Sequence, residues 1–448
     1  MQRPADTIAA IATPPGAGGL GIVRISGPSA PRIAEGLLGE LPAPRYATLC
    51  SFRGAQGELI DSGIALYFPA PRSFTGEDVL ELQGHGGTVV LHQVLRRVLE
   101  LGARLARPGE FSERAFLNDK IDLVQAEAIA DLIESGTEAA VRAALRSLQG
   151  EFSSRVHALQ ERLTGLRVFV EAAIDFPDEE IDFLADSDVA QRLEEAEGEL
   201  GRLLANARQG RLLRDGIVLA IIGRPNAGKS SLLNALSGED TAIVTEIPGT
   251  TRDVLRTQID LDGVPVHLAD TAGIRHTTDT IEAEGVRRAR KALESADVVL
   301  LVMDATAEST DSELAAEIPA YAQCLRVLNK VDLLPPEERE SRESDRELLR
   351  ISALTGHGMD ELRRRIRSAA GVPGEVRGVF SARQRHIDAL RRAGRHLASG
   401  REVLQATQAG ELLAEELRLA QQALGEITGE MLPDDLLGEI FSSFCIGK

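Results

Sequence analysis

The chain has 448 residues, of which 50 are basic and 69 acidic, giving a formal net charge of −19 at pH 7. A single hydrophobic core rarely serves so long a chain, so we expect two to four domains. Neutralisation of phosphates dominates affinity for nucleic acids, so strong unaided RNA binding is not expected of a chain this acidic. Three cysteines suit a reducing cytoplasm rather than a disulfide framework, and the absence of an 18-residue apolar stretch argues against a membrane span.

The N-terminal region, residues 1–118, is rich in glycine and proline and contains short apolar runs, which predicts a mixed α/β domain. Gly16, Gly18 and Gly21 match the spacing of a dinucleotide-binding fingerprint. They lead into a strand-like segment, whereas that fingerprint requires a helix at this point, so we reject a Rossmann site here.

Apolar residues take up a helical spacing from Ile121 to about residue 210, interrupted by an acidic segment at 175–180. The helical pattern resumes after residues 373–374. Two helical blocks, residues 119–213 and 374–448, therefore flank residues 214–373. Since compact domains with neighbouring termini are tolerated as insertions, we predict one helical domain with a second domain inserted into it.

The inserted region opens with a phosphate-binding loop between Gly223 and Ser230. The apolar run 217–222 predicts a buried strand before the loop, and residues 231–236 predict a helix after it. Backbone N–H groups at such a helix start attract phosphate, Lys229 would neutralise the β and γ oxygens, and the Ser230 hydroxyl suits Mg²⁺. The loop residues that we assign to nucleotide binding are Asn226, Ala227, Gly228, Lys229, Ser230 and Ser231.

Two further motifs predict that the nucleotide is GTP. Asp332 follows a strand predicted at 324–328 and can accept hydrogen bonds from N1–H and the exocyclic amine of guanine. Adenine lacks that pair of donors, so the carboxylate would be left unpaired. A third base-contacting loop follows the strand predicted at 348–351. The base-contacting residues are Asn329, Lys330, Asp332, Ser352, Ala353 and Leu354.

The segments expected to sense the γ-phosphate lie between these motifs. Thr251 would give Mg²⁺ a second hydroxyl ligand, and Asp262 with Gly263 is typical of a hairpin turn. Asp270 would hold the metal through water, and the Gly273 N–H would contact the γ-phosphate. The residues assigned to GTP here are Thr245, Glu246, Ile247, Pro248, Gly249, Thr250, Thr251, Asp270, Thr271, Ala272 and Gly273.

The residue after this last motif is Ile274. A Ras-type GTPase carries a glutamine there, which orients the attacking water. Isoleucine has no polar atom for that role. The sequence therefore predicts a GTPase that obtains its catalytic power by another route.

Several motifs together resemble a known family. The P-loop asparagine, the Thr-x-Arg-Asp string at 250–253 and the apolar residue after Asp-Thr-Ala-Gly look like the potassium-activated translation-factor-class GTPases. The Cys-x-Gly-Lys end at 445–448 and the segments 6–27, 74–87 and 107–120 are similar to the MnmE (TrmE) family of tRNA modification GTPases.

The resemblance spans essentially the whole chain and implies a multidomain α+β protein. It predicts an N-terminal α/β folate-binding domain, an all-α helical domain and an inserted Ras-like P-loop α/β GTPase domain. The implied ranges are 1–118 for the folate-binding and dimerisation domain, 119–213 and 374–448 for the helical domain, and 214–373 for the GTPase domain.

The resemblance also implies what replaces the glutamine. A potassium ion beside the nucleotide would be held by Asn226, Thr245, Ile247 and Thr250, with Mg²⁺ held by Ser230 and Thr251. Glu282 would position the hydrolytic water. On the residues alone, Glu284 is an alternative.

A tetrahydrofolate derivative, 5-formyl-tetrahydrofolate, is implied at Arg24, Glu81, Lys120 and Lys448. A carboxylate such as Glu81 suits the amino-pyrimidine edge of a pterin, and basic groups suit the carboxylates of the glutamyl tail. Cys445 would lie near this site. Whether it acts as a nucleophile or as a structural contact stays open.

The implied activity is modification of tRNA by a homodimer in the cytoplasm. A heterotetramer with the flavoprotein MnmG, which carries FAD and NADH, would add an aminomethyl or carboxymethylaminomethyl group to C5 of the wobble uridine, from ammonium or glycine. The tRNA would be bound jointly with this partner. Two alternatives remain: a ribosome-assembly GTPase, which predicts a basic RNA-binding appendage, and a folate-dependent one-carbon transferase whose GTPase domain only scaffolds.

Overall fold

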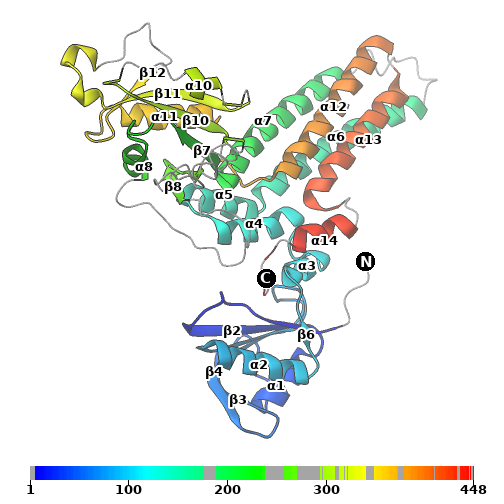
Figure 1. Ribbon diagram of the computed structural model, residues 1–448. Helices are drawn as coiled ribbons and strands as arrows, with labels where there is room; N and C mark the ends of the chain where they lie inside the picture. The colour runs from blue at the N-terminus through cyan, green and yellow to red at the C-terminus, as the bar shows by residue number, and fades with distance from the viewer. Residues whose placement is uncertain are drawn as a thin grey trace. The chain divides into compact units, whose positions relative to one another are not determined.

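The structure is a computed structural model, shown in Figure 1. It describes residues 6–175, 188–237, 257–269, 293–294, 296–307, 312–316, 318–319, 321–339, 348–371, 378–407, 409–430, 434–442, 444 and 447. The chain divides into two compact units. The first unit comprises residues 1–130, 152–187 and 399–448, and the second comprises 131–151 and 188–398.

A six-stranded sheet in the order β3-β4-β5-β2-β1-β6 forms the N-terminal part of the first unit, antiparallel except where β1 meets β6. Its strands are β1 (Ile8–Ile11), β2 (Gly18–Ser26), β3 (Thr48–Arg53), β4 (Leu59–Phe68), β5 (Val79–Gly86) and β6 (Arg104–Leu105). Helices α1 (Ala30–Leu38) and α2 (Thr88–Glu100) pack on the face that buries Val23 and Leu82. Gly18 and Gly21 of the glycine motif lie within β2, where the dinucleotide fingerprint requires a helix, so the rejection of a Rossmann site is confirmed.

Helices complete the first unit, and all but α3 lie where the helical spacing of apolar residues predicts them. They are α3 (Glu110–Leu117), α4 (Leu123–Glu134), α6 (Glu151–Asp175), α12 (Gln384–Thr407), α13 (Gly410–Thr428) and α14 (Asp434–Ser442); α4 ends in the second unit and α12 begins in it. Among the helices described, none is long and apolar enough to cross a bilayer.

Helix α14 packs against α3 within the first unit. The ring of Phe441 lies 6.2 Å from that of Phe116 on α3 and 5.3 Å from that of Phe444. Gly109, at φ 66°, lies so close that a Cβ there would be 2.4 Å from the Phe441 carbonyl oxygen. A side chain at residue 109 would therefore push the last helix away from α3.

The second unit contains a sheet in the order β12-β11-β10-β7-β9-β8, parallel except for β8. Its strands are β7 (Ile217–Ile222), β8 (Thr257–Leu261), β9 (Val264–Ala269), β10 (Val298–Asp304), β11 (Gln323–Asn329) and β12 (Leu348–Arg350). The strands predicted at 217–222, 324–328 and 348–351 are confirmed. So is the hairpin turn, with Asp262 at φ 51° and Gly263 at φ 91°.

Helical segments surround this second sheet. They are α5 (Glu138–Leu148), α7 (Val189–Asp215), α8 (Lys229–Ser237), α10 (Ser312–Ala316), α11 (Met359–Ala369) and the 3₁₀ turns η1 (Val331–Leu333) and η2 (Pro336–Glu338). The helix predicted after the phosphate-binding loop is thus confirmed as α8. It begins two residues before the range expected from the sequence.

Helix α5 belongs to the core of this second unit, although it lies far from the sheet in sequence. Ala139 and Ala143 are buried in the same apolar cluster as the sheet residues. The Thr137 hydroxyl accepts a hydrogen bond from the Ala140 N–H, capping α5, and donates to the Gly263 carbonyl oxygen at 3.1 Å. The β8–β9 hairpin is therefore seated on the N-terminus of α5.

Candidate functional site

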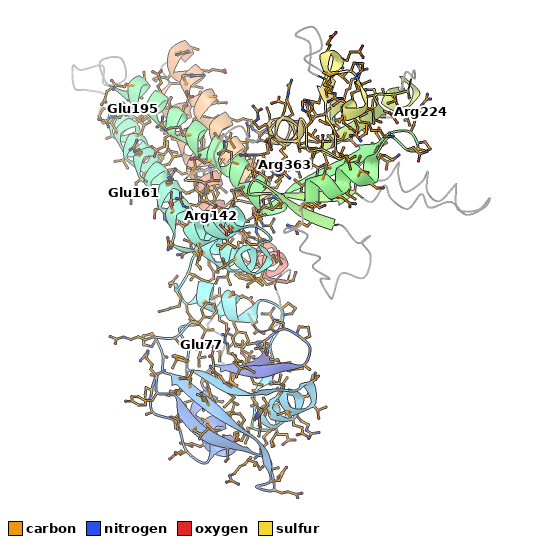
Figure 2. The ribbon with its side chains drawn as sticks, turned by 90° about the vertical axis from the view of Figure 1, so that its left-hand side faces the viewer. Glu77, Arg142, Glu161, Glu195, Arg224 and Arg363 are labelled. Atoms are coloured by element: carbon orange, nitrogen blue, oxygen red, sulfur yellow. The ribbon has the colours of Figure 1, made fainter. Side chains whose placement is uncertain are left out.

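The phosphate-binding loop follows directly from β7, and Arg224 in this loop is labelled in Figure 2. Gly223 adopts φ 155°, and a Cβ at this residue would stand 2.2 Å from the Val302 carbonyl oxygen. A Cβ at Gly228, at φ 89°, would stand 2.2 Å from the Asn329 side-chain nitrogen. Neighbouring strands therefore approach the loop so closely that only glycine fits at these two positions.

Lys229 begins α8 and turns its amine back over the loop. Its Nζ donates to the carbonyl oxygens of Gly223 at 2.7 Å and Arg224 at 2.8 Å, and burial lowers the pKa of this amine. Phosphate oxygens are stronger acceptors than these carbonyls, so a nucleotide would take over the ammonium group. The Ser230 hydroxyl is exposed and makes no hydrogen bond with the described residues, which leaves it available to a metal.

Asn329 joins three loops of the site at the end of β11. Its side chain is 2% exposed. The amide nitrogen donates to the Ala227 carbonyl oxygen at 3.1 Å, and the amide oxygen accepts from the Ala353 N–H at 3.1 Å. One buried side chain thus holds the phosphate-binding loop and both base-contacting loops together.

The guanine-reading loop is fixed on either side of Asp332. Lys330, at φ 67°, donates to the Asp304 carboxylate at 2.6 Å. Desolvation acts to raise the pKa of Asp304, but hydrogen bonds from Lys330 and Thr306 outweigh it and hold that pKa below its usual range. Arg339 bonds the backbone oxygen of Asp332 at 3.1 Å, whereas the half-buried Asp332 carboxylate meets no partner among the described residues. The Asp332 carboxylate is therefore available to accept hydrogen bonds from a guanine base.

The third loop is shaped by Ser352, which is fully buried. Its N–H donates to the His357 carbonyl oxygen at 2.9 Å, and its hydroxyl accepts from the Thr355 N–H at 3.1 Å. Leu354 projects from the same loop with 86% of its surface exposed. Ser352 thus shapes the turn of this loop. The exposed Leu354 side chain is positioned to cover a bound guanine base.

The other residues predicted to contact GTP or its metals lie outside the described residues. These are Thr245, Glu246, Ile247, Pro248, Gly249, Thr250, Thr251, Asp270, Thr271, Ala272 and Gly273, together with the water-positioning candidate Glu282. Cys445 and Lys448 of the predicted folate site also lie outside them.

A second cluster of predicted residues lies on the sheet of the first unit. Arg24 on β2 stands opposite Glu81 on β5, and its Nε lies 2.9 Å from the Glu81 Oε1. The Arg24 Nη1 donates to the Gly447 carbonyl oxygen at 3.3 Å. The rings of Phe74 and Phe111 lie 5.9 Å and 5.8 Å from its guanidinium carbon. The structure thus brings Arg24, Glu81 and Gly447 together.

Lys120 lies at the edge of this cluster. Its amine donates to the Pro71 carbonyl oxygen at 3.2 Å, on the loop that also carries Phe74. The Arg24 Nη2 and the Glu81 Oε2 have no hydrogen-bond partner among the described residues. The Arg24–Glu81 pair therefore offers a donor beside an acceptor, the pattern that a pterin edge would match.

Comparison with known proteins covers the whole chain. A family model of the MnmE helical domain matches residues 123–445, and a model of the GTP-binding protein TrmE N-terminus matches residues 7–120. A tRNA modification GTPase MnmE of Nitrosococcus oceani is 57% identical over 100% of this chain and 98% of its own length. Those of Chromohalobacter salexigens and Methylococcus capsulatus are each 58% identical over 99% of this chain, covering 98% and 99% of their own lengths.

The chain belongs to the MnmE family of tRNA modification GTPases. As an MnmE-family protein it is a GTP hydrolase of tRNA modification that uses Mg²⁺ with its nucleotide. The predicted multidomain α+β fold with an inserted P-loop domain is confirmed. Membership favours tRNA modification over the two alternatives, ribosome assembly and a folate transferase with an inert GTPase domain.

Sequence reasoning missed two groups of residues in this MnmE-family protein. Asp304, the partner of Lys330, ends the apolar strand β10, and a carboxylate at the carboxyl end of a buried parallel strand is a signal that was available. The second group is a set of carboxylates around the buried Arg114 in the first unit. A single sequence gives no signal that joins those charges, because their partners come from separate parts of the chain.

Proposed function

We propose that this protein is a potassium-dependent GTPase that acts with the flavoprotein MnmG on the wobble uridine, position 34, of certain tRNAs. The complex would add an aminomethyl or carboxymethylaminomethyl group at C5, with the carbon drawn from a tetrahydrofolate derivative. GTP hydrolysis would bring the GTPase domains together and apart and so gate the assembled site. Family membership over the full chain supports the tRNA half of this proposal.

The observation that carries the potassium requirement is Asn226. It adopts φ 65° in the phosphate-binding loop, and its exposed amide makes no hydrogen bond within the described part of the chain. A neutral amide oxygen in the phosphate-binding loop suits an alkali cation as a ligand. Potassium, when bound there, would supply the positive charge that an arginine finger gives to other GTPases.

The folate half of the proposal rests on the Arg24–Glu81 pair. Among the residues that the structure describes, the pair leaves one donor of Arg24 and one acceptor of Glu81 unused, with two aromatic rings about the guanidinium. Glu81 would accept from the pterin's amino-pyrimidine edge, and Lys120 would attract the carboxylates of the glutamyl tail. FAD and NADH would be held by the MnmG partner.

We propose that the chain forms a homodimer through its N-terminal domain. In the cytoplasm, this homodimer would bind MnmG and form a heterotetramer with it. With a net charge of −19, the chain on its own offers little neutralisation to a tRNA backbone. The tRNA would therefore bind jointly to this chain and to its partner.

Turnover in two salts tests the potassium requirement. At equal ionic strength, we expect the full chain to hydrolyse GTP much faster in potassium than in sodium. Sodium's smaller radius suits the same oxygen cage poorly. Asn226→Ala should weaken that preference and leave Mg²⁺·GTP binding largely intact, since the amide is not needed for phosphate contact. Turnover and nucleotide affinity, measured in each salt, check both expectations.

Glu282→Ala provides the matched control, because it removes the proposed water-positioning residue and leaves the cation site untouched. It should lower kcat by roughly 10–10³. In the presence of GDP and aluminium fluoride, potassium should still promote association of the GTPase domains of this variant with each other, as measured by light scattering. Equal hydrolysis in sodium and potassium, with an active Glu282→Ala variant, would contradict the mechanism and leave the GTPase assignment standing.

Cys445→Ser tests the role of the C-terminal tail. Gly447, two residues after Cys445, accepts a hydrogen bond from Arg24 of the proposed folate site, and the tail is distant from the nucleotide loops in sequence. We expect potassium-stimulated GTP hydrolysis near the wild-type rate and impaired tRNA modification in a reaction reconstituted with MnmG. Full modification by this variant would make Cys445 a packing residue.

A further inference from the structure

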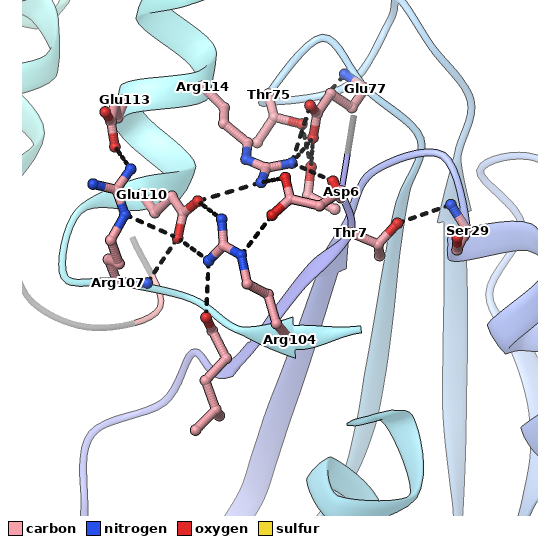
Figure 3. Close-up of polar contacts among 12 residues, drawn as sticks. Asp6, Thr7, Ser29, Thr75, Glu77, Arg104, Arg107, Glu110, Glu113 and Arg114 are labelled. Carbon is pink, nitrogen blue, oxygen red and sulfur yellow. Dashed lines mark hydrogen bonds and ion pairs between the residues drawn. The ribbon is translucent and has the colours of Figure 1, made fainter. Parts of the chain in front are cut away.

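A cluster of charged side chains, some buried and some exposed, lies in the first unit (Figure 3). At its centre is Arg114 on α3, whose side chain is only 1% exposed. Its guanidinium lies 2.9 Å from the Asp6 carboxylate, 3.0 Å from Glu77 and 3.3 Å from Glu110. Arg104 joins the same cluster through Asp6 and Glu110. We call these five residues the Arg114 cluster.

Within the cluster, only the bond to Glu77 reaches the loop at residues 69–78, between β4 and β5. The Arg114 Nη1 donates to both Glu77 oxygens, at 3.2 Å and 3.0 Å. The Ser26 hydroxyl on β2 donates to Glu77 at 2.7 Å and lies 2.7 Å from the Thr75 hydroxyl (Figure 3 shows Thr75, Glu77 and Arg114). Arg114 thus ties this loop to α3 while Ser26 ties it to the sheet.

Each of the two elements that Arg114 joins carries one aromatic ring of the Arg24 site. The loop carries Phe74, and α3 carries Phe111, whose rings lie 5.9 Å and 5.8 Å from the Arg24 guanidinium carbon. Phe111 is fully buried, whereas Phe74 is 39% exposed and therefore depends on its loop for its position. The loop meets α3 and its C-cap through two bonds: the one between Arg114 and Glu77, and one from the Asn118 amide nitrogen to the Thr75 carbonyl oxygen at 2.8 Å. The Arg114–Glu77 bond is therefore one of the two contacts that set the separation of the rings.

We propose that Arg114 is a positioning residue for the folate site, acting through Glu77 to hold Phe74 against Arg24 and the pterin. This role rests on the proposed folate function of Arg24 and Glu81. Arg114 itself lies behind the site and would not touch the ligand. Loss of its link to Glu77 would let the loop, and Phe74 with it, move away from the Arg24–Glu81 pair.

Arg104 is the matched control, because it shares the cluster and lacks the link to the loop. It is 43% exposed and bonds Asp6, Glu110 and the Leu105 carbonyl oxygen. Desolvation acts to raise the pKa of Glu110, but hydrogen bonds from Arg104 and the Arg107 amide outweigh it and hold that pKa below its usual range. Arg104 therefore stabilises the buried Glu110 of the same cluster, so Arg104→Met should destabilise the domain without moving Phe74.

The first measurement is the affinity of the full chain for 5-formyl-tetrahydrofolate by isothermal titration calorimetry, well below the Tm of each variant. Glu77→Gln and Arg114→Met should weaken binding by about tenfold or more, as lost support behind a binding residue does. Arg104→Met should bind within about twofold of the wild type, even with a lowered Tm. If Arg114→Met fails to fold, the near-isosteric Glu77→Gln variant still decides the question.

The second measurement reads the position of the loop without folate. The chain has no tryptophan, so Phe74→Trp introduces a single indole beside Arg24. Adding Arg114→Met to this variant should shift the emission to the red and raise quenching by acrylamide, whereas adding Arg104→Met should change neither.

Equal affinities and equal quenching in the two arginine variants would overturn the proposal and leave Arg114 a stabilising residue only. A wild-type chain that binds no folate would instead overturn the proposed function and the folate role of Arg114 with it. The quenching comparison would then still show whether Arg114 fixes Phe74, so the two failures are distinguishable.

Discussion

Replacing Asp332 by asparagine should exchange the base preference of the enzyme, lowering its affinity for GTP by about 10⁴ and making xanthosine triphosphate a substrate. The Asp332 carboxylate offers two acceptors to the N1–H and the amine of guanine. Asparagine places an NH₂ donor against one of these donors, whereas xanthine carries an oxygen there and restores the pair. Dissociation constants and turnover for the two nucleotides measure the exchange.

Asp304→Asn makes the same chemical change at a neighbouring carboxylate and serves as the control. Asp304 bonds Lys330 and is not assigned to the base, so this variant should gain no use of xanthosine triphosphate. An Asp332→Asn enzyme that hydrolyses GTP with an unchanged KM would show that the guanine loop has been assigned wrongly.

Asn329→Asp should destabilise the GTPase fold by about 3 kcal/mol at neutral pH, because it buries a charge and leaves one carboxylate oxygen without a donor. The Asn329 amide nitrogen donates to the Ala227 carbonyl oxygen, and a carboxylate oxygen in its place would face that carbonyl with no proton between them. The phosphate-binding loop would lose its tie to the base loops, so GTP affinity should fall as well. Thermal unfolding and nucleotide binding measure these two losses.

The pH dependence of the loss identifies its cause. Burial and the facing carbonyl should raise the pKa of the carboxyl introduced by Asn329→Asp. Below that pKa the protonated acid can donate to Ala227, so the deficit in stability should shrink as the pH falls and grow as it rises. A deficit that stays constant across pH would point to altered packing instead of a buried charge.

The parts of the site that the sequence predicts are those encoded in one short segment. The strand, the glycines and Lys229 of the phosphate-binding loop lie within 13 residues of one another, since the strand begins at Ile217, and their geometry follows from local backbone rules. The hairpin turn at Asp262 and Gly263 is likewise local, because a two-residue turn of this type needs positive φ at both residues.

The features that sequence reasoning missed depend on contacts between distant segments. Thr137 and Gly263 are 126 residues apart, and Arg114 and Asp6 are 108 apart. No periodicity or motif encodes such a pairing, because it is decided by how complete elements pack. The double hydrogen bond of Asn329 is a similar case: the motif predicts the residue, but only the packed loops show that its side chain is buried among them.

The seating of the β8–β9 hairpin on α5 affects any fragment cut at the ends of the inserted domain. A polypeptide of residues 214–373 would lack Ala139 and Ala143, so their apolar neighbours in the sheet would face water. The hairpin would also lose its hydrogen bond to Thr137, although its two strands lead from and toward the segments assigned to the γ-phosphate. Such a fragment would carry every nucleotide motif of the full chain. The GTP hydrolysis measured on it would, however, be that of a domain without the support of α5.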